Sequence, residues 1–355
     1  MLDYIIIGSG LGGIAFCETA HEHNKSFIVI NDDSQNSSKV AAGLYNPVIL
    51  KRFSQVWHAN EQLHLLTTFY EKLEIKLKIK LDYKLPIYRK LYNVEEQNNW
   101  FTATDKPGIT GFLSNKLIQI ENPFLKAQFG FGQVFKTGFI DTKLLLTFYQ
   151  NYLKSINSYL NQSFDHSILK CHNNYIAYKD IKAKHIIFAE GFGVHSNPFF
   201  NYLPVDGTKG ELLLIKAIDL NIEEIINSSL YLIPLGHGIY KVGATYNWHD
   251  KTNLPTHAGK EELIESLKNL ITCDFDIIDH KAGVRPTVKD RRPLIGTHPT
   301  YKRYHILNGL GTRGVMLAPE MATHLMNHIE KGIILHEHID IKRYDTLHYA
   351  NLDCI

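Results

Sequence analysis

The hydrophobic positions at the start of the chain follow first one pattern and then another. Ile5, Ile6 and Ile7 form a short β-branched run, which is typical of a buried strand in a parallel sheet. The segment "GSGLGGIAF" then carries glycines into an apolar stretch, and a second apolar run, "FIVI", occupies residues 27–30. This order predicts a strand, a glycine turn, a helix and a second strand.

Helical spacing of apolar residues recurs further along the chain. It predicts helices within residues 56–77, 138–156 and 260–271, and a long final helix that begins near Val315. Asp141 is a suitable N-cap for the second of these helices, since its carboxylate can accept a hydrogen bond from the first turn.

Shorter apolar runs predict strands of two kinds. One buried strand is expected at residues 186–189, and another lies just before the final helix. The segments "GELLLIKA", "SLYLIPL" and "GIYKVGATY" instead predict successive strands of a different, largely antiparallel sheet. We therefore expect an α/β fold, α+β overall, in which a Rossmann-like domain is interleaved with a mainly antiparallel second domain.

The first glycines fit the pattern G-x-G-x-x-G of a dinucleotide site. Gly8 permits a tight turn, Gly10 lets the backbone approach a pyrophosphate, and Gly13 lets the helix pack closely on the strand. The position that usually binds ribose holds Asn31, and Asp32 follows it, so either residue is a candidate. A bare glycine turn is the alternative, and the pattern does not distinguish NAD from FAD.

The composition narrows the class of protein. Of 355 residues, 44% are hydrophobic and 21% are charged, which is typical of a globular protein. The net charge of +2 gives no excess of positive charge for binding nucleic acid. The cysteines are too scattered for a metal or redox motif, so we expect reduced thiols in a cytoplasmic protein and no metal site. We find no signal peptide and no apolar run of the roughly 20 residues that span a membrane. The cysteines are Cys17, Cys171, Cys273 and Cys354.

Several segments in order then suggest a family. They are "SSKVAAGL", "IIFAEGFGVHS", "LPVDGTKGELLLI", "YLIP" with "GIYKVGAT", "AGVRPTVKDRRPLIGTHP" and "NGLGTRGVMLAP". Together they resemble the D-amino-acid-oxidase superfamily of FAD enzymes over nearly the whole chain, most closely the glycine oxidase and sarcosine oxidase branch. "GLGTRG" is also similar to the oxidase half of the bifunctional tRNA 5-methylaminomethyl-2-thiouridine enzyme.

The resemblance implies FAD as the cofactor, bound non-covalently because no cysteine clearly matches the flavin-linking position of sarcosine oxidases. It implies an FAD-binding domain of residues 1–78, 131–204 and 286–355 and a substrate domain of residues 79–130 and 205–285. The residues expected at the cofactor are Gly8, Gly10, Leu11, Gly13, Asn31, Asp32, Ser38, Ala42, Gly43, Leu44, Ala189, Glu190, Gly191, Gly296, Gly309, Gly311, Thr312, Arg313, Gly314 and Val315.

The same resemblance implies a substrate site. Arg285 matches an arginine that binds a substrate carboxylate, or else braces the turn at Pro286. Tyr231 and Tyr246 match the pocket wall, or else pack within the sheet and at its rim, and Arg313 is either a second cation at the substrate or an anchor for its loop.

Other candidates near this site are weaker. Arg291 and Arg292 are expected to face water or to pair with Asp290. Single histidines and aromatic residues near the ends of the pocket strands and in the loop after the second strand are either pocket groups or surface groups. They are His237, His249, Trp248, Tyr45, Lys51 and Arg52.

The implied activity is FAD-dependent oxidation of the C–N bond of a small amino acid or secondary amine, with hydride transfer to flavin N5 and hydrolysis of the imine. Dioxygen or another acceptor takes the electrons, membrane and nucleic-acid partners are not expected, and an oligomer is compatible with the sequence. The alternatives are an oxidase that trims carboxymethylaminomethyl groups on tRNA wobble uridine, and a flavin-binding protein without amine oxidase turnover.

Overall fold

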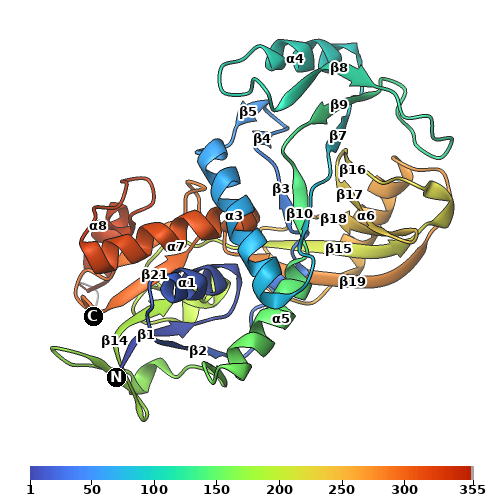
Figure 1. Ribbon diagram of the computed structural model, residues 1–355. Coiled ribbons are helices and arrows are strands. Elements are labelled where there is room, and N and C mark those ends of the chain that lie inside the picture. Colours follow the sequence, from blue (N-terminus) through green and yellow to red (C-terminus); the bar gives the residue numbers. More distant parts are fainter. Residues whose placement is uncertain (353–355) are drawn as a thin grey trace.

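The computed structural model describes residues 1–352, which form two large sheets (Figure 1). The first sheet is built around β1 (Leu2–Ile7), which pairs in parallel with β2 (Phe27–Asn31) and β14 (Ile181–Phe188). Beyond β2 lies β11 (Tyr159–Asn161), and β21 (Tyr304–Asn308) pairs with β14, again in parallel. Three antiparallel strands complete the sheet: β12 (Lys170–Cys171), β13 (Ile176–Tyr178) and β20 (Leu294–Thr297).

Both faces of the first sheet are covered, as the β-branched run in β1 predicts. Ile5 and Ile6 point to opposite faces and are both fully buried. Four long helices pack over one face and against one another, as Figure 1 shows. They are α1 (Leu11–Glu22), α3 (Ala59–Leu77), α5 (Thr142–Ser155) and α7 (Gly314–Lys331).

The predicted helices of this layer are confirmed. In α3 the side chains of Leu66, Tyr70 and Leu73 are buried, at the spacing that the sequence pattern predicted. The Asp141 carboxylate accepts a hydrogen bond from the backbone N–H of Leu144 at 2.9 Å and so caps α5.

The second sheet is longer and almost entirely antiparallel, and only the pair formed by β16 and β7 is parallel. α6 (His257–Lys268) covers its outer face, and α4 (Val94–Thr104) packs at its far end through the fully buried Trp100. In spatial order the strands are β19 (Asp276–Arg285), β15 (Thr208–Lys216), β18 (Ile239–Gly243), β17 (Tyr231–Gly236), β16 (Ile225–Asn227), β7 (Ile87–Lys90), β9 (Phe131–Val134) and β8 (Leu113–Ile118).

A mixed fold with two interleaved sheets is therefore confirmed, but the predicted boundary at residue 131 is wrong. β9 pairs with β7 and β8 inside the second sheet. A three-stranded sheet of β3 (Leu44–Tyr45), β10 (Gly138–Ile140) and β6 (Asp82–Tyr83) then links segments assigned to different domains. These pairings join distant parts of the chain, so local hydrophobic patterns cannot reveal them.

The remaining elements are short. They are α2 (Ser37–Val40), α8 (Asp345–Leu352), the hairpin of β4 (Val48–Ile49) and β5 (Ser54–Gln55), and the 3-10 turns His166–Ile168, Gly191–Ser196, Ile218–Leu220, Gly311–Arg313 and Ile341–Tyr344. None of the helices within residues 1–352 combines the length and the apolar composition that crossing a membrane requires.

Candidate active site

One large cavity lies between the two sheets, with a volume of about 1190 Å³. One end is lined by the residues that follow β1, β2 and β14 at their carboxyl ends, where parallel sheets usually bind ligands. The other end is lined by one face of the second sheet and by the start of α7. Sites for drug-sized ligands measure roughly 300–1,000 Å³, so this cavity has room for a dinucleotide together with a small substrate.

The glycine turn after β1 leaves no room for side chains. Gly8 has φ +97°, and a Cβ atom there would lie 2.5 Å from the carbonyl oxygen of Ala189. A Cβ atom on Gly13 would lie 2.0 Å from the carbonyl oxygen of Gly8, so α1 packs directly on the turn. The Leu11 N–H at the start of α1 donates to Ser38 Oγ at 3.2 Å, and the first turn of this helix borders the cavity. This cradle fits the pyrophosphate of a dinucleotide.

The two ribose candidates differ in what they already bind. The Asn31 side-chain oxygen accepts a hydrogen bond from the Ser9 N–H at 3.1 Å, so this residue braces the glycine turn. Partial burial raises the pKa of Asp32, but hydrogen bonds from Ser163 and Ser34 outweigh it and leave the pKa below its usual value. Asp32 therefore stays ionised, and both residues border the cavity.

The expected cofactor residue Glu190 belongs to a polar group beside this end of the cavity, and the sequence patterns missed its partners. Glu190 Oε1 lies 3.0 Å from His166 Nε2, and Glu190 Oε2 accepts a hydrogen bond from Asn197 at 2.7 Å. Gln162, Phe164 and His166 also line the cavity. All three follow β11, so the carboxyl end of a further parallel strand is the signal that could have revealed them.

The start of α7 also lines the cavity, between the glycine turn and the second sheet. The glycines before it have positive φ angles, +70° at Gly309 and +54° at Gly311. No side chain of the described residues caps α7, and its first N–H groups and its positive dipole end border the cavity. The expected residues of this segment that line the cavity are Gly311, Thr312, Arg313, Gly314 and Val315.

Gly296 lies elsewhere than expected. It pairs with Ile306 in the middle of β21, and a Cβ atom there would lie 2.8 Å from Ile341. Two residues earlier, Leu294 pairs with Asn308, and Asn308 lines the cavity. Gly13 and Gly309 also lie behind the cavity wall, whereas the other expected cofactor residues line it.

Arg285 ends β19 and points its guanidinium group into the cavity. Its Nη1 atom donates to the carbonyl oxygen of Thr245 at 3.4 Å, and the guanidinium carbon lies 4.7 Å from the centre of the Tyr246 ring. Burial lowers the pKa of Arg285, although the neighbouring Tyr246 acts in the opposite direction. No carboxylate within residues 1–352 pairs with this cation.

Arg313 approaches the same end of the cavity from the start of α7. Its Nη1 atom donates to the carbonyl oxygen of Asn46 at 3.4 Å, and burial lowers its pKa. Tyr231 lies close enough to affect that pKa, and burial raises the pKa of Tyr231 itself. Among the described residues no carboxylate pairs with Arg313 either. Two partly buried guanidinium groups that have no carboxylate partner among the described residues can together bind a carboxylate.

The weaker candidates separate clearly. Tyr246 and Lys51 line the cavity, whereas Tyr45 is buried elsewhere and donates to Asp82 at 2.8 Å. Of the two alternatives for Arg291 and Arg292, an ion pair with Asp290 is not formed, because the Asp290 carboxylate binds Arg343 at 3.0 Å. Arg291 is exposed, in agreement with the other alternative, and the Arg292 guanidinium group lies over the Trp57 ring at 5.0 Å. Trp248, His237, His249 and Arg52 do not line the cavity.

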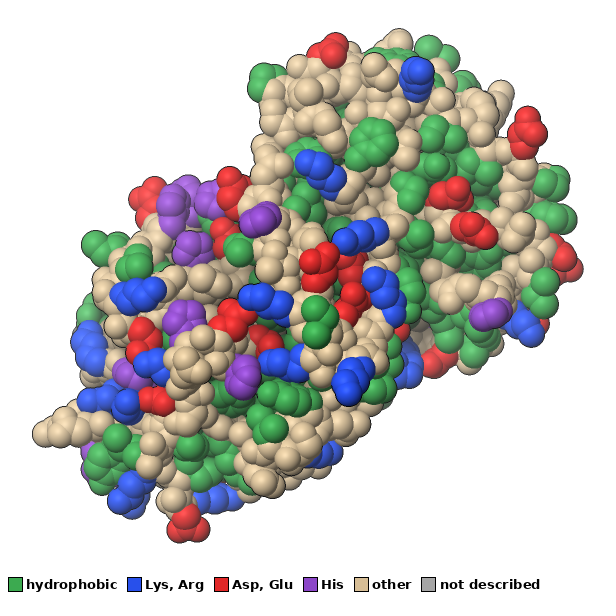
Figure 2. Space-filling model, viewed as in Figure 1, with side chains coloured by type: hydrophobic (Ala, Val, Ile, Leu, Met, Phe, Trp, Pro, Cys, Tyr) green, Lys and Arg blue, Asp and Glu red, His purple; other side chains and the backbone are tan. Residues whose placement is uncertain are grey.

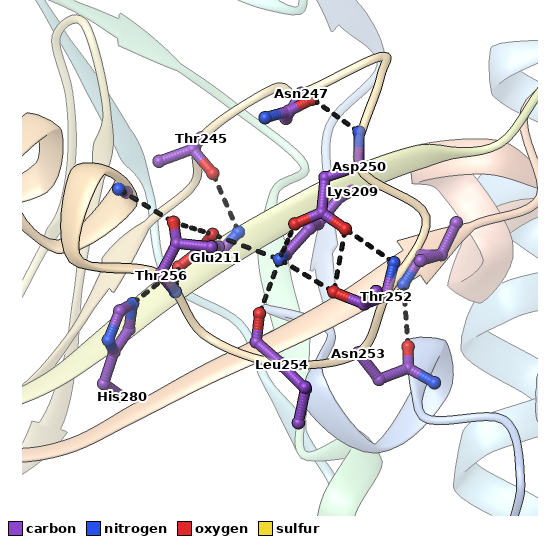
Figure 3. Close-up of polar contacts among 12 residues, drawn as sticks. Lys209, Glu211, Thr245, Asn247, Asp250, Thr252, Asn253, Leu254, Thr256 and His280 are labelled. Atoms are coloured by element: carbon purple, nitrogen blue, oxygen red, sulfur yellow. Dashed lines mark hydrogen bonds and ion pairs between the residues drawn. The ribbon is translucent and has the colours of Figure 1, made fainter.

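A buried ionic network lies on the opposite face of the sheet (Figure 3). Along β15, Lys209 alternates with the cavity residues Gly210 and Leu212 and therefore lies on the other face of the sheet. It is fully buried and pairs with Asp250. A hydrogen bond from Lys209 lowers the pKa of Asp250 to about 2.

Glu211 completes this network. Its carboxylate lies 2.9 Å from His280 Nε2 and accepts hydrogen bonds from the backbone N–H and the hydroxyl of Thr256. Lys209 and Glu211 thus fix the segment 245–256, which brings Thr245 and Tyr246 to Arg285.

Comparison with known proteins now decides the family. A family model described as "FAD dependent oxidoreductase" (DAO) matches residues 3–327. The chain belongs to this family. Membership confirms the expected cofactor, FAD. The glycine turn before α1 fits the phosphates of that cofactor, and the start of α7 fits its electron-rich edge.

Relatives of known name match shorter stretches of the chain. A glycine oxidase of Bacillus subtilis (strain 168) is 30% identical over 147 residues, which cover 39% of this chain and 39% of that protein. The tRNA 5-methylaminomethyl-2-thiouridine biosynthesis bifunctional protein MnmC of Campylobacter fetus is 28% identical over 124 residues, covering 33% of this chain and 20% of that protein. The matching segments thus span well under half of either relative.

Solved structures agree with the fold over nearly the whole chain. Iminodiacetate oxidase from Chelativorans sp. BNC1 has a TM-score of 0.77 at 17% identity, with 96% of this chain and 98% of that chain covered. Glycine oxidase from Bacillus cereus ATCC 14579 has a TM-score of 0.75 at 19% identity, with 94% and 96% covered. At such identities these likenesses establish the fold.

Proposed function

We propose that the protein oxidises the C–N bond of a small amino acid or secondary amine that carries a carboxylate. The observation that supports this most is the pair Arg285 and Arg313. Both are partly buried, have no carboxylate partner in residues 1–352, and lie at the end of the cavity away from the glycine turn. Glycine oxidases among the relatives and an iminodiacetate oxidase among the solved structures agree with this substrate class.

The arginines would bind and orient the substrate. A guanidinium group offers two parallel N–H donors to the two oxygens of a carboxylate and keeps its charge when buried. Holding the substrate in one orientation can contribute several kcal/mol to the rate, on the order of 7–11 kcal/mol in the best cases.

The same two cations would favour the neutral form of the substrate amine. Two nearby cations disfavour the ammonium form, so the amine loses its proton more easily in this cavity than in water. Tyr231, whose pKa burial raises, keeps its hydroxyl proton and can donate a hydrogen bond to the bound carboxylate.

The bound FAD supplies the two-electron redox chemistry of the family. In the net reaction the CH–NH unit loses two electrons and two protons, and water adds across the resulting C=N bond to release an amine and a carbonyl compound. Dioxygen or another acceptor takes up the electrons. The residues expected to hold the phosphates are Gly8, Gly10 and Leu11, with Gly311–Val315 at the flavin end.

Anaerobic bleaching of the flavin absorbance tests this proposal. The purified protein is mixed with glycine, sarcosine, longer N-alkyl glycines and both enantiomers of common amino acids. We expect at least one of these compounds to bleach the flavin rapidly. If the protein binds FAD and none does, the proposal is wrong and the protein is a flavoprotein without this turnover.

Trimming of a carboxymethylaminomethyl group on tRNA is a second candidate, supported by the MnmC relatives. Charge speaks against it: positive and negative side chains are interspersed on the face in Figure 2, and the net charge is +2. Release of glyoxylate from tRNA carrying that group, but not from free amino acids, would favour this candidate.

A further inference from the structure

We infer that the substrate carries an uncharged polar extension, of the size of a side-chain amide, that reaches beyond the two arginines to a second polar group of the cavity. This inference rests on the proposed function and names the class of substrate more closely. The second group, here called the far lobe, consists of Arg89, Glu96, Asn99, Asn227, Ser228 and Ser229, all of which line the cavity.

Strand register places the far lobe on the same sheet face as the carboxylate site. Arg89 is directly opposite Asn227, Asn227 is opposite Tyr231, and Tyr231 is opposite Gly243. Residues that are directly opposite one another share a face. The side chains therefore form a row across neighbouring strands that all border the cavity.

The row is much longer than a simple amino acid. Five strand intervals separate β19, which carries Arg285, from β7, which carries Arg89. At about 4.8 Å per interval the two backbones lie roughly 24 Å apart. Even with both arginine side chains reaching inward, glycine or sarcosine bound at Arg285 leaves the far lobe without a partner.

Asn227 is the strongest sign that the far lobe binds a ligand. Only 7% of this residue is exposed, it lines the cavity, and its side chain makes no hydrogen bond to another residue in the described part of the chain. A mostly buried amide that lacks a protein partner and borders a cavity can bind a polar group of a ligand. The Arg89 Nε atom is likewise buried without a partner within residues 1–352.

The charges of the far lobe select an uncharged group. Arg89 Nη2 lies 3.7 Å from Glu96 Oε1, and Arg89 Nη1 donates to the carbonyl oxygen of Ser228 at 3.0 Å. The carboxylate offsets the guanidinium charge, so the lobe presents hydrogen-bond donors and acceptors with little net charge. An amide, which both donates and accepts, matches that set.

The extension can stand on the substrate nitrogen or on its α-carbon, and isosteric pairs of substrates distinguish the two. The first pair is N-(3-amino-3-oxopropyl)glycine and N-(3-methylbutyl)glycine. The second is glutamine and homoleucine, each as both enantiomers. Within a pair the shape is the same and only the amide differs. We expect kcat/KM for the amide to exceed that for the hydrocarbon at least tenfold in one pair.

Variants tie this preference to the far lobe. Asn227→Leu keeps the volume and removes the amide, and we expect the ratio of kcat/KM within the preferred pair to fall at least fivefold. Because Asn227 is buried, Asn99→Ala on α4 is the second variant, with the same direction expected. Asn98→Ala is the matched control, since Asn98 is its exposed neighbour on α4 and does not line the cavity.

The outcomes separate the two proposals. If hydrocarbon and amide are oxidised equally well in both pairs, or if Asn98→Ala changes the ratio as much as Asn99→Ala does, the inference is overturned while amine oxidation stands. If none of the compounds, sarcosine included, reduces the flavin, the proposed function fails as well.

Discussion

Gly210 and Arg285 lie against each other on neighbouring strands, and the guanidinium group of Arg285 fills the space that a side chain at position 210 would need. A Cβ atom on Gly210 would lie 2.0 Å from Nη2 and 2.2 Å from Cζ of Arg285. Gly210 pairs with Gly283, two residues before Arg285 on β19. A glycine-lined stretch of sheet thus accommodates the cation that we place at the substrate carboxylate.

Gly210→Ala should displace this guanidinium group. The backbone of Gly210 belongs to a central strand and cannot withdraw, so the side chain of Arg285 has to move. We expect the apparent Kd for a carboxylate substrate or inhibitor, measured by flavin absorbance, to rise at least tenfold. FAD itself should remain bound, because Gly210 is far from the glycine turn; an unchanged Kd would contradict the role assigned to Arg285.

Arg285→Lys tests the geometry of the carboxylate site. Lysine keeps the charge but loses the two parallel donors, so we expect carboxylate binding to weaken by about 1.5–3 kcal/mol. The measurement is the substrate Kd in anaerobic titrations, with flavin content as the control. Equal binding by both proteins would show that Arg285 braces the turn at Pro286 and does not bind the substrate.

Lys209→Met should act on the active site from behind the sheet. The substitution removes the buried cation that binds Asp250 and the carbonyl oxygen of Leu254 (Figure 3). Breaking a buried pair costs about 3–5 kcal/mol, and less where one partner is partly exposed, as Asp250 is.

The segment 245–256 then loses its anchor. We expect a lower Tm and a higher KM for the variant, since Thr245 and Tyr246 no longer hold Arg285 in place. Lys216→Met is the matched control, because Lys216 is exposed at the end of the same strand. A loss of Tm with an unchanged KM would mean that the network stabilises the fold without positioning Arg285.

Acid should destabilise the protein through buried histidines. His185 Nδ1 lies 3.0 Å from His305 Nε2, and His305 in turn bonds Thr297. Burial lowers the pKa values of His185 and His298 to about 4 each, and it also holds the pKa of His305 well below its usual value.

The direction of this pH effect on stability follows from the unfolded chain, in which a histidine has a pKa of about 6.5. Above that pH neither state binds the proton and the stability is complete. As the pH falls from about 6.5 towards 4, these histidines bind protons in the unfolded state but not in the folded state, so the folded state becomes less stable. Each histidine then removes up to about 1.4 kcal/mol per pH unit. Urea unfolding between pH 7 and pH 4 measures this loss, and His185→Gln should reduce its slope.

Local patterns in the sequence predicted the elements well. The β-branched run at Ile5, the spacing of Leu66, Tyr70 and Leu73, and the cap at Asp141 each depend on neighbours within a few residues, and the structure has all three. The glycine turn followed from the same kind of local signal. The boundary at residue 131 could not be predicted in this way, because β9 is assigned to its sheet by pairing with β7 and β8.

The sequence by itself determined the elements, the glycine turn and, through its motifs, the family with FAD as cofactor. Only the tertiary structure decided which charged residues lack a partner. Only the family resemblance separates Arg285 from Arg291 in the sequence. In the structure Arg291 is exposed, whereas Arg285 is partly buried against Gly210 with no carboxylate partner in residues 1–352. The far lobe is equally invisible along the chain, since Arg89 and Asn227 meet only through the register of β7 and β16. Burial and pairing between distant segments are properties of the packed chain, and it is these that turn an ordinary arginine or asparagine into a binding group.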